Sequence, residues 1–379
     1  MMQTLTLITL YVAAIILFCG VASRLPVLAP ESQHRVSSLD GLRGILATAV
    51  VVYHLTVSYY WHTTSLWQMT DSRVINNFGA VPVSLFFMIT GYLFGSKVSR
   101  GVPAWRAIFV SRVRRIFPMY LVSVALVAAI AFLQPGDQPA SFMGNVRALG
   151  HWLVFLAAPI NGVQGSWVIN AGVQWTLQYE AMFYVALPLL YCLLQRRLAL
   201  VAVAVSVLGL AALWAMYATQ FDARYLKLFV AGIAVALLEH RLRCAPVDYT
   251  KWPFTLVALL ALMLCMSLEP YSAAQMILLA GPFCMFVLGN SLGGLLEHRG
   301  LKVLGEASFS IYLLHGILIY TLFNVLAVHD FQAGTFFSFA WYLPLVLWGA
   351  AILGVATYWG VERPFMRQGS HKVVRPAQV

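Results

Sequence analysis

The sequence predicts an all-α membrane protein, a polytopic bundle of about eleven transmembrane helices with the N-terminus outside and the C-terminus in the cytoplasm. Its composition is the first observation behind this prediction. Of the 379 residues, 61% are apolar and only 10% are charged, whereas soluble domains carry about 25% charged residues. The second observation is a mean hydropathy of +0.81. Together these values argue against a soluble enzyme and exclude intrinsic disorder.

Apolar runs along the chain are the third observation. A run of about 17–25 residues spans the hydrocarbon layer of a bilayer, and eleven candidates lie near residues 4–23, 44–61, 78–96, 116–133, 176–194, 198–217, 226–238, 253–268, 272–289, 306–327 and 338–361. The run at 226–238 is the shortest. We interpret the first run as a true helix rather than a signal peptide, because no basic residue precedes Arg24 and no small-residue cleavage site follows.

The formal net charge of +11 reflects 24 Lys and Arg residues against 13 Asp and Glu. An excess of this size suits nucleic acid, anionic lipid or membrane topology. With the eleven runs in place, 20 of the 24 basic residues fall in loops on one side of the membrane. The positive-inside rule therefore sets the orientation, and we expect no nucleic-acid partner. Residues 134–174 form the longest outer segment, in which an apolar piece at 151–160 predicts a re-entrant or interfacial helix.

Several kinds of site are not indicated. The five cysteines form no CxxC pair, so the sequence predicts neither a disulfide framework nor a zinc site. The histidines show no metal-ligand spacing, and we expect no metal. Phosphate-loop, GxGxxG and GxSxG motifs are absent. Only 15 residues follow Pro364, so we expect no appended soluble domain.

The first candidate site is the segment SSLDGLRGILATAVVVYH, residues 37–54. Arg43 and His54 are eleven residues apart, so they project from one helix face with an axial separation of about 16 Å. Arginine can hold a phosphate with its bidentate fork, and histidine can move protons near neutral pH. Asp40, one turn earlier, caps the helix or orients Arg43. The structural alternative is a snorkelling arginine and a hydrogen-bonded core histidine.

The second candidate is the basic cluster in SRVRRIFPMY, which precedes an apolar helix with Pro118 in its first turn. Arg112 and Arg115 are three residues apart and share a helix face, so they can pair on one phosphate. An ordinary positive-inside cluster is the alternative interpretation.

Three further ionisable groups lie in apolar surroundings, where charges are costly and often functional. Glu180 is predicted near the outer half of its helix, beside Trp175 and Tyr184, as an acid or base or a structural carboxylate. His315, with Ser308 and Tyr312 on the preceding turns, is a second base, a substrate contact or a core histidine. Glu362 ends the last helix, where we expect an ion pair with a nearby arginine.

Seven motifs, taken together in their order, resemble acyltransferase family 3, the membrane-embedded acyltransferases that modify bacterial surface sugars. The hallmark is an arginine or lysine, ten residues, then histidine, which matches Arg43 and His54. The other matches, in chain order, are VPVSLFFMITGYLF at 81–94, the Arg112 and Arg115 pair, WTLQYEAMFYVALP around Glu180, FVAGIAVALL around Gly232, GEASFSIYLLH ending in His315, and VERP. The resemblance covers roughly residues 37–366.

The resemblance implies a family core of about ten helices at 31–366, with an extra N-terminal helix at 1–30 and a cytoplasmic tail at 367–379. It implies transfer of an acyl group, usually acetyl, from cytoplasmic acetyl-CoA to a carbohydrate hydroxyl in the bacterial inner membrane. Known acceptors of the family include O-antigen, exopolysaccharide, peptidoglycan, nodulation oligosaccharides and macrolides. By motif match, His54 is catalytic, with Glu180 and His315 in less settled roles. Arg43, Arg112 and Arg115 hold the CoA phosphates.

Two chemical routes remain open: His54 deprotonates the acceptor hydroxyl, or it carries the acyl group first. The second route needs a pore to the outside, for which Trp175, Glu180 and Tyr184 are candidates, and we add Asp40 and Tyr312 as substrate contacts. Outer aromatics at Trp61, Trp67, Trp152 and Trp167 stack on sugars or form an interfacial belt. A secondary transporter of a sugar precursor or organic anion and a non-catalytic component of a polysaccharide assembly complex are the competing functions.

Overall fold

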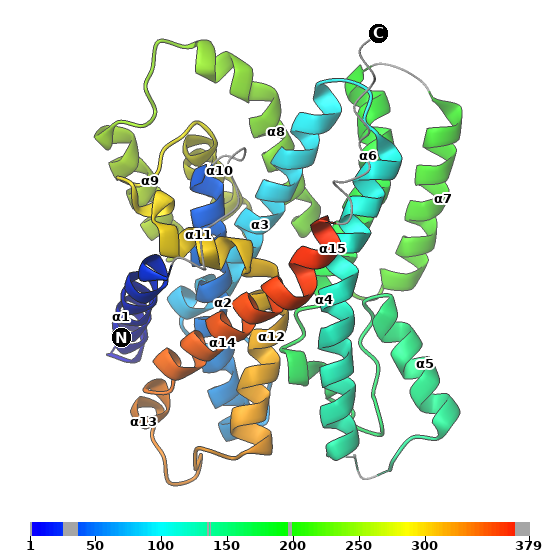
Figure 1. The fold of residues 1–379 in the computed structure, drawn as a ribbon, viewed down its shortest axis with the longest axis vertical. Helices are drawn as coiled ribbons and strands as arrows, with labels where there is room; N and C mark the ends of the chain where they lie inside the picture. Colours follow the sequence, from blue (N-terminus) through cyan, green and yellow to red (C-terminus); the bar gives the residue numbers. More distant parts are fainter. Residues whose placement is uncertain (1, 26–36, 135, 137, 196–198, 368–379) are drawn as a thin grey trace.

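The computed structural model describes residues 2–25, 37–134, 136, 138–195 and 199–367, and throughout these residues the regular secondary structure is helical (Figure 1). The helices are α1 (Met2–Arg24), α2 (Ser37–Thr64), α3 (Arg73–Ser99), α4 (Trp105–Leu133), α5 (Phe142–Leu153), η2 (Ser166–Asn170), α6 (Trp175–Gln195), α7 (Leu200–Tyr217), α8 (Arg224–Cys244), α9 (Trp252–Cys265), α10 (Ala273–Val287), η3 (Leu295–Glu297), α11 (Arg299–Glu306), α12 (Ser308–Tyr320), η4 (Thr321–Val325), α13 (Phe336–Ala340), α14 (Leu343–Thr357), η5 (Tyr358–Glu362) and α15 (Arg363–Arg367).

Each of the eleven predicted apolar runs coincides with helix in the structure. Among the described residues, eight segments are long and apolar enough to cross a membrane: α1 to α4, α6, α7, α12 with η4, and the run Phe336–Arg367. Helices α9 and α10 are apolar but shorter, and α8 contains five charged residues. The all-helical membrane fold is confirmed, while eleven crossings and their orientation stay predictions. The expected boundary near residue 30 and nearly all of the expected tail lie outside the described residues.

The segment between α4 and α6 differs from the prediction of a helix at 151–160. The helix there, α5, begins nine residues earlier, because the Ser141 hydroxyl caps it by accepting a hydrogen bond from the backbone N–H of Gly144. It ends at Leu153, and Phe155 adopts a positive φ of 64°. A short η2 helix follows. Apolar content alone therefore placed the helix too far along the chain.

Close helix contacts hold the centre of the bundle, where α2, α3 and α12 lie between α1 at one margin and α7 at the other (Figure 1). Glycines permit these contacts. A Cβ added at Gly91 of α3 would meet the carbonyl oxygen of Phe229 on α8, and one added at Gly232 of α8 would meet that of Met88. Small residues let membrane helices approach closely where burial from water supplies no driving force. The FVAGIAVALL motif thus packs α8 against α3.

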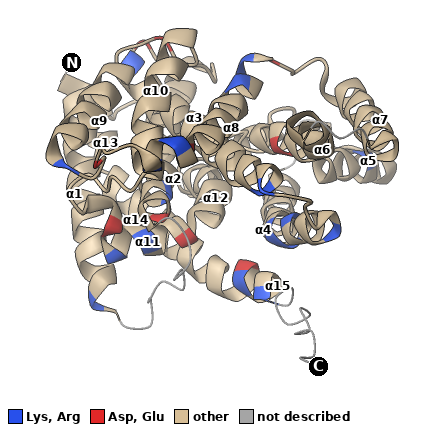
Figure 2. Cartoon of the chain, turned by 90° about the horizontal axis from the view of Figure 1, so that it is seen from above, with Lys and Arg blue, Asp and Glu red and all other residues tan. Residues whose placement is uncertain are grey.

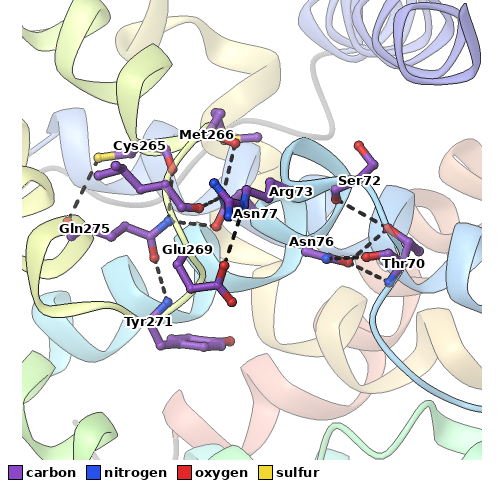
Figure 3. Close-up of polar contacts among 11 residues, drawn as sticks. Thr70, Ser72, Arg73, Asn76, Asn77, Cys265, Met266, Glu269, Tyr271 and Gln275 are labelled. Carbon is purple, nitrogen blue, oxygen red and sulfur yellow. Dashed lines mark hydrogen bonds and ion pairs between the residues drawn. The ribbon is translucent and has the colours of Figure 1, made fainter. Parts of the chain in front are cut away.

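A buried polar network ties the α9–α10 turn to the start of α3 (Figure 3). The Gln275 amide donates to the Asn77 side-chain oxygen at 2.7 Å and to the Cys265 carbonyl at 3.0 Å, and its own oxygen accepts from the Tyr271 backbone at 2.8 Å. Gln275 and Asn77 are both fully buried. An Arg73–Glu269 ion pair of 3.6 Å joins the same two segments at the exposed edge. The network satisfies a turn that would otherwise leave backbone groups unpaired.

Charged side chains are few in the bundle, and α4 carries several of the basic ones (Figure 2). Four arginines lie in its first eleven residues. Most of the remaining surface is apolar, including long stretches of α1 and α7. These exposed apolar faces suit contact with lipid rather than water.

Candidate functional site

The α2–α12 interface brings together the two polar pairs that the sequence places far apart. The Arg43 guanidinium donates a hydrogen bond to the Ser308 hydroxyl at 2.8 Å. Farther along both helices, His54 Nδ1 lies 2.8 Å from His315 Nε2. His315 is fully buried. Residues 43 and 54 therefore share the face of α2 that packs on α12, as their spacing predicts.

Arg43 borders a cavity that we call the arginine cavity. Its empty volume is about 840 Å³, including its open mouth. It is lined by Arg43, Val83, Phe86, Phe87, Ile89, Thr90, Leu93, Phe94, Arg112, Arg115, Ile116, Thr176, Leu177, Glu180, Tyr184, Ser308, Phe309 and Tyr312. The walls are mostly apolar, and three guanidinium groups converge on them. Such a cavity can receive a ligand with an anionic end and a less polar arm.

Helix α4 supplies two of the three arginines that line the cavity, and another arginine of α4 lies outside the lining. Arg112 and Arg115 line the cavity, whereas Arg114, between them, does not. The Arg112 guanidinium lies over the Phe94 ring at 5.2 Å, and its Nε is buried without a hydrogen-bond partner in the described chain. The helical spacing of three residues thus selects the pair that the sequence predicts, and Arg112 retains a donor for a ligand.

Glu180 and Tyr184 lie in the arginine cavity, with the Tyr184 hydroxyl donating to a Glu180 carboxylate oxygen at 2.9 Å. They share this cavity with the arginines rather than with His54, and the expectation that they help to line a pore to the outside stays a prediction. Trp175, the third residue of that expectation, packs against Phe87 and Tyr225 and lines neither cavity described here. Its assignment as a substrate contact stays a prediction.

His54 borders a second, smaller cavity, which we call the histidine cavity; its empty volume, including its open mouth, is about 210 Å³. It is lined by His54, Ser58, Trp61, Trp67, Val168, Ala171, Gly316, Ile319, Tyr320 and Asn324. The rings of His54 and Trp67 are nearly parallel with centroids 6.4 Å apart. Trp167 meets Trp67 edge-on. By contrast, Trp152 is fully buried, its indole N–H donating to the Ala158 carbonyl, so it is not available to stack on a ligand.

Helix α12 runs from one cavity to the other. Ser308, Phe309 and Tyr312 line the arginine cavity, whereas Gly316, Ile319 and Tyr320 line the histidine cavity. His315 falls between these two sets. The Tyr312 hydroxyl lies 3.2 Å from both the Thr176 hydroxyl and the Val173 carbonyl, which joins α12 to the start of α6 at this level. The histidine pair therefore stands at the transition between the two cavities.

Asp40 and Glu362 contact residues of the two helices that carry the site, α2 and α12. Asp40 lies within the first turn of α2, so it does not cap the helix, but it pairs with Arg43 at 3.8 Å and can orient that side chain. Glu362 lies in the π-helical η5 and accepts a hydrogen bond from Ser310 at 3.0 Å. Among the described residues it forms no ion pair within 4.0 Å, so the prediction that Glu362 forms an ion pair with a nearby arginine is wrong.

Two polar residues of the histidine cavity were missed by reasoning from the sequence. Ser58 is four residues after His54, on the same helix face, and Asn324 is four residues after Tyr320. A polar residue inside an apolar run, at helical spacing from a candidate histidine, is the signal that would have identified them.

The described residues contain no group of three or more His, Cys, Asp or Glu side chains placed to hold a metal ion. The two cavities offer imidazole, guanidinium, carboxylate and hydroxyl groups. Fold and site together define a multi-pass helical membrane protein with a histidine pair beside an arginine-lined cavity.

The chain belongs to acyltransferase family 3, whose model, described as an acyltransferase domain, matches residues 36–359. It is therefore an acyltransferase by family. Over 89% of its length it is 25% identical to a Bacillus subtilis protein named "Putative peptidoglycan O-acetyltransferase YrhL", and the match covers 56% of that protein. No solved structure matches the chain.

Two other relatives match shorter parts of the chain. "Nodulation protein 10" of Rhizobium leguminosarum bv. viciae is 28% identical over 47% of this chain and 51% of its own length. A Staphylococcus aureus protein named "Putative O-acetyltransferase SACOL0978" is 22% identical over 42% of this chain and 25% of its own. The chain thus spans about half or less of the length of these relatives.

Proposed function

We propose that this protein transfers an acyl group, most simply acetyl, from acyl-CoA to a hydroxyl group of a cell-surface or lipid-linked carbohydrate. The observation that carries the proposal is the placement of the histidine pair between two cavities of different chemistry. One cavity offers three guanidinium groups, and the other offers an imidazole and tryptophan rings. A donor with phosphates and an acceptor with sugar rings need these two kinds of surface.

The arginine cavity suits the donor. Coenzyme A carries phosphates at one end and a long pantetheine arm that ends in the thioester. Arg112, with its unpartnered Nε, and Arg115 would bind phosphate oxygens. Arg43, which contacts Ser308 and Asp40, lines the same cavity. The apolar walls around Phe87 and Phe94 would cover the arm.

The histidine cavity suits the acceptor. The His54 imidazole takes a proton from the acceptor hydroxyl, whose oxygen then attacks the carbonyl carbon of the thioester. A carbon–oxygen bond forms, the carbon–sulfur bond breaks, and the CoA thiolate leaves. In the second route, the imidazole first accepts the acyl group and then passes it to the hydroxyl. The names of two relatives, which refer to peptidoglycan and to nodulation, support a carbohydrate as acceptor.

Purified protein in nanodiscs, incubated with acetyl-CoA and candidate glycans, tests the proposal. We expect release of free thiol that depends on the acceptor. Mass spectrometry of surface polysaccharide from cells with and without the chain should show a shift of one acetyl unit. Substrate uptake into liposomes without acyl-CoA, and no thiol release, would instead favour the transporter.

A further inference from the structure

The contacts of His315 determine which nitrogen of each histidine carries a proton. His315 Nδ1 lies 3.2 Å from the Ile311 carbonyl oxygen, and its Nε2 lies 2.8 Å from His54 Nδ1. Both ring nitrogens of this fully buried side chain are therefore engaged. A carbonyl oxygen only accepts hydrogen bonds, so the proton of His315 is on Nδ1.

The second histidine follows from the first. A neutral imidazole has one N–H, so His315 Nε2 is left as an acceptor. His54 Nδ1, at 2.8 Å, must then be the donor, and His54 Nε2 retains its lone pair. If His315 were charged, its Nε2–H would donate to His54 Nδ1, which reverses the direction of the hydrogen bond. No carboxylate is among the contacts of His315 in the described residues, and burying an unpaired charge is costly.

We infer that His315 is a positioning residue that fixes His54 in the tautomer whose Nε2 is the free base. This inference rests on the proposed function for its catalytic meaning. In hydrolases with a Ser-His-Asp triad, a carboxylate holds the histidine in the required tautomer. Here a second imidazole, backed by the Ile311 carbonyl, does the same. A neutral orienting group avoids burying a permanent charge at membrane depth, where charges are expensive.

The geometry also directs the base toward the histidine cavity. Because Nδ1 of His54 faces His315, the opposite edge of the ring, which includes Nε2, is the part left to border the cavity with Trp67 and Trp61. Tyr312, by contrast, faces the arginine cavity from the preceding turn of α12. His54 therefore serves the acceptor hydroxyl rather than the phosphates of the donor.

Nitrogen-15 NMR of the full chain tests the tautomer without any substrate. Histidine labelled at both ring nitrogens, in nanodiscs, gives distinct shifts for protonated and lone-pair nitrogens, and a His54→Gln spectrum assigns the His54 signals. We expect a protonated Nδ1 and a lone-pair Nε2 at His54, with a larger lone-pair share at Nδ1 in His315→Leu, where only the Val50 backbone remains, among the described residues, as a hydrogen-bond partner of the ring. A lone-pair Nδ1 at His54 in the wild type would overturn the inference, whether or not the protein transfers acyl groups.

Kinetics test the consequence. His315→Leu removes the acceptor, and we expect kcat to fall roughly 100-fold, within the range that general-base catalysis supplies, with KM for acetyl-CoA unchanged. In His315→Gln the side-chain oxygen can accept from His54 Nδ1–H, so at least tenfold of the loss should return. Leu318→Met, on a part of α12 that packs toward Gly349, is the matched control and should retain activity.

Equal losses in His315→Leu and His315→Gln, with the control intact, would show that orientation by an acceptor is not the role of His315. Full activity in His315→Leu would overturn the inference as well. If the wild type itself releases no thiol, the proposed function fails, and the NMR result still decides the tautomer.

Discussion

The Arg43 guanidinium donates a 2.8 Å hydrogen bond to the Ser308 hydroxyl, and this contact links α2 to α12. From Arg43 to His54 the α2 axis rises about 16 Å, whereas from Ser308 to His315 the α12 axis rises about 10 Å. Arg43 nevertheless contacts Ser308, and His54 contacts His315. The long arginine side chain can cover this difference, and Arg43, Ser308 and Arg112 all line the arginine cavity.

Replacing His54 with alanine should abolish most acyl transfer. The imidazole is the basic group of the histidine cavity, and a positioned general base typically contributes 10²–10⁴-fold, so we expect roughly that loss in kcat. Thiol release from acetyl-CoA with an acceptor present is the measurement. Thr63→Ala, an exposed change near the end of the same helix, is the control. Full transfer by His54→Ala would refute the proposed mechanism.

Substitutions in the arginine cluster should separate ligand binding from membrane topology. Arg112→Gln and Arg115→Gln each remove a guanidinium from the arginine cavity, while Arg114→Gln removes the same charge outside it. Hydrogen bonds to charged groups contribute about 1.5–3 kcal/mol, so KM for acetyl-CoA should rise roughly 10- to 100-fold in the first two variants. Arg114→Gln should differ little from the wild type. Equal effects at all three positions would indicate a cluster that only orients the helix.

The α3–α8 contact should tolerate no side chain at Gly91. Its added Cβ would meet the backbone carbonyl of Phe229, which cannot move away as a flexible side chain can. Overpacking of this kind typically costs 1–3 kcal/mol, so Gly91→Ala should lower the melting temperature in detergent. Gly281→Ala in α10, where nothing lies within 4 Å, should be neutral or slightly stabilising. Equal melting temperatures would mean that the two helices can separate at low cost.

Gln275 should matter for stability rather than for chemistry. Gln275→Leu leaves the Asn77 side-chain oxygen and the Cys265 carbonyl without their partner (Figure 3), and each unsatisfied buried group costs about 1–3 kcal/mol. Thermal unfolding followed by tryptophan fluorescence should show a lower midpoint, with KM for acetyl-CoA unchanged. The exposed Gln332→Leu serves as control. An unaltered midpoint in Gln275→Leu would mean that water replaces the lost partner.

Helical periodicity was enough to predict part of the site. Arg43 and His54 at a spacing of eleven, and Arg112 and Arg115 at a spacing of three, lie on the faces that their spacing indicates, because an α-helix turns by a fixed 100° per residue. The same arithmetic left Arg114 off that face. Residues within one helix can therefore be related to each other from the sequence alone.

Contacts between residues of different helices could not be predicted from the sequence. The contact of His54 with His315 joins residues 261 positions apart, and no property of either segment specifies it. Glu180 was expected toward the outer half of its helix and lies in one cavity with the arginines, because the level of α6 depends on its packing against α3, α7 and α8. Trp152, an apparent sugar-stacking residue, is fully buried near the end of α5, where its indole N–H donates to the Ala158 carbonyl and its own carbonyl accepts from Tyr120.

By itself, the sequence determined the fold class, the helical segments, the family and the ionisable residues worth examining, because hydropathy and periodicity are local properties of the chain. Only the tertiary structure decided that the arginines and the histidines border two separate cavities, and that His315 engages His54. Those facts depend on side-chain packing between α2, α4, α6 and α12. Such packing depends on complementary shapes, such as the close approach at Gly91. Complementarity involves surfaces from two helices, so it cannot be read from either segment alone.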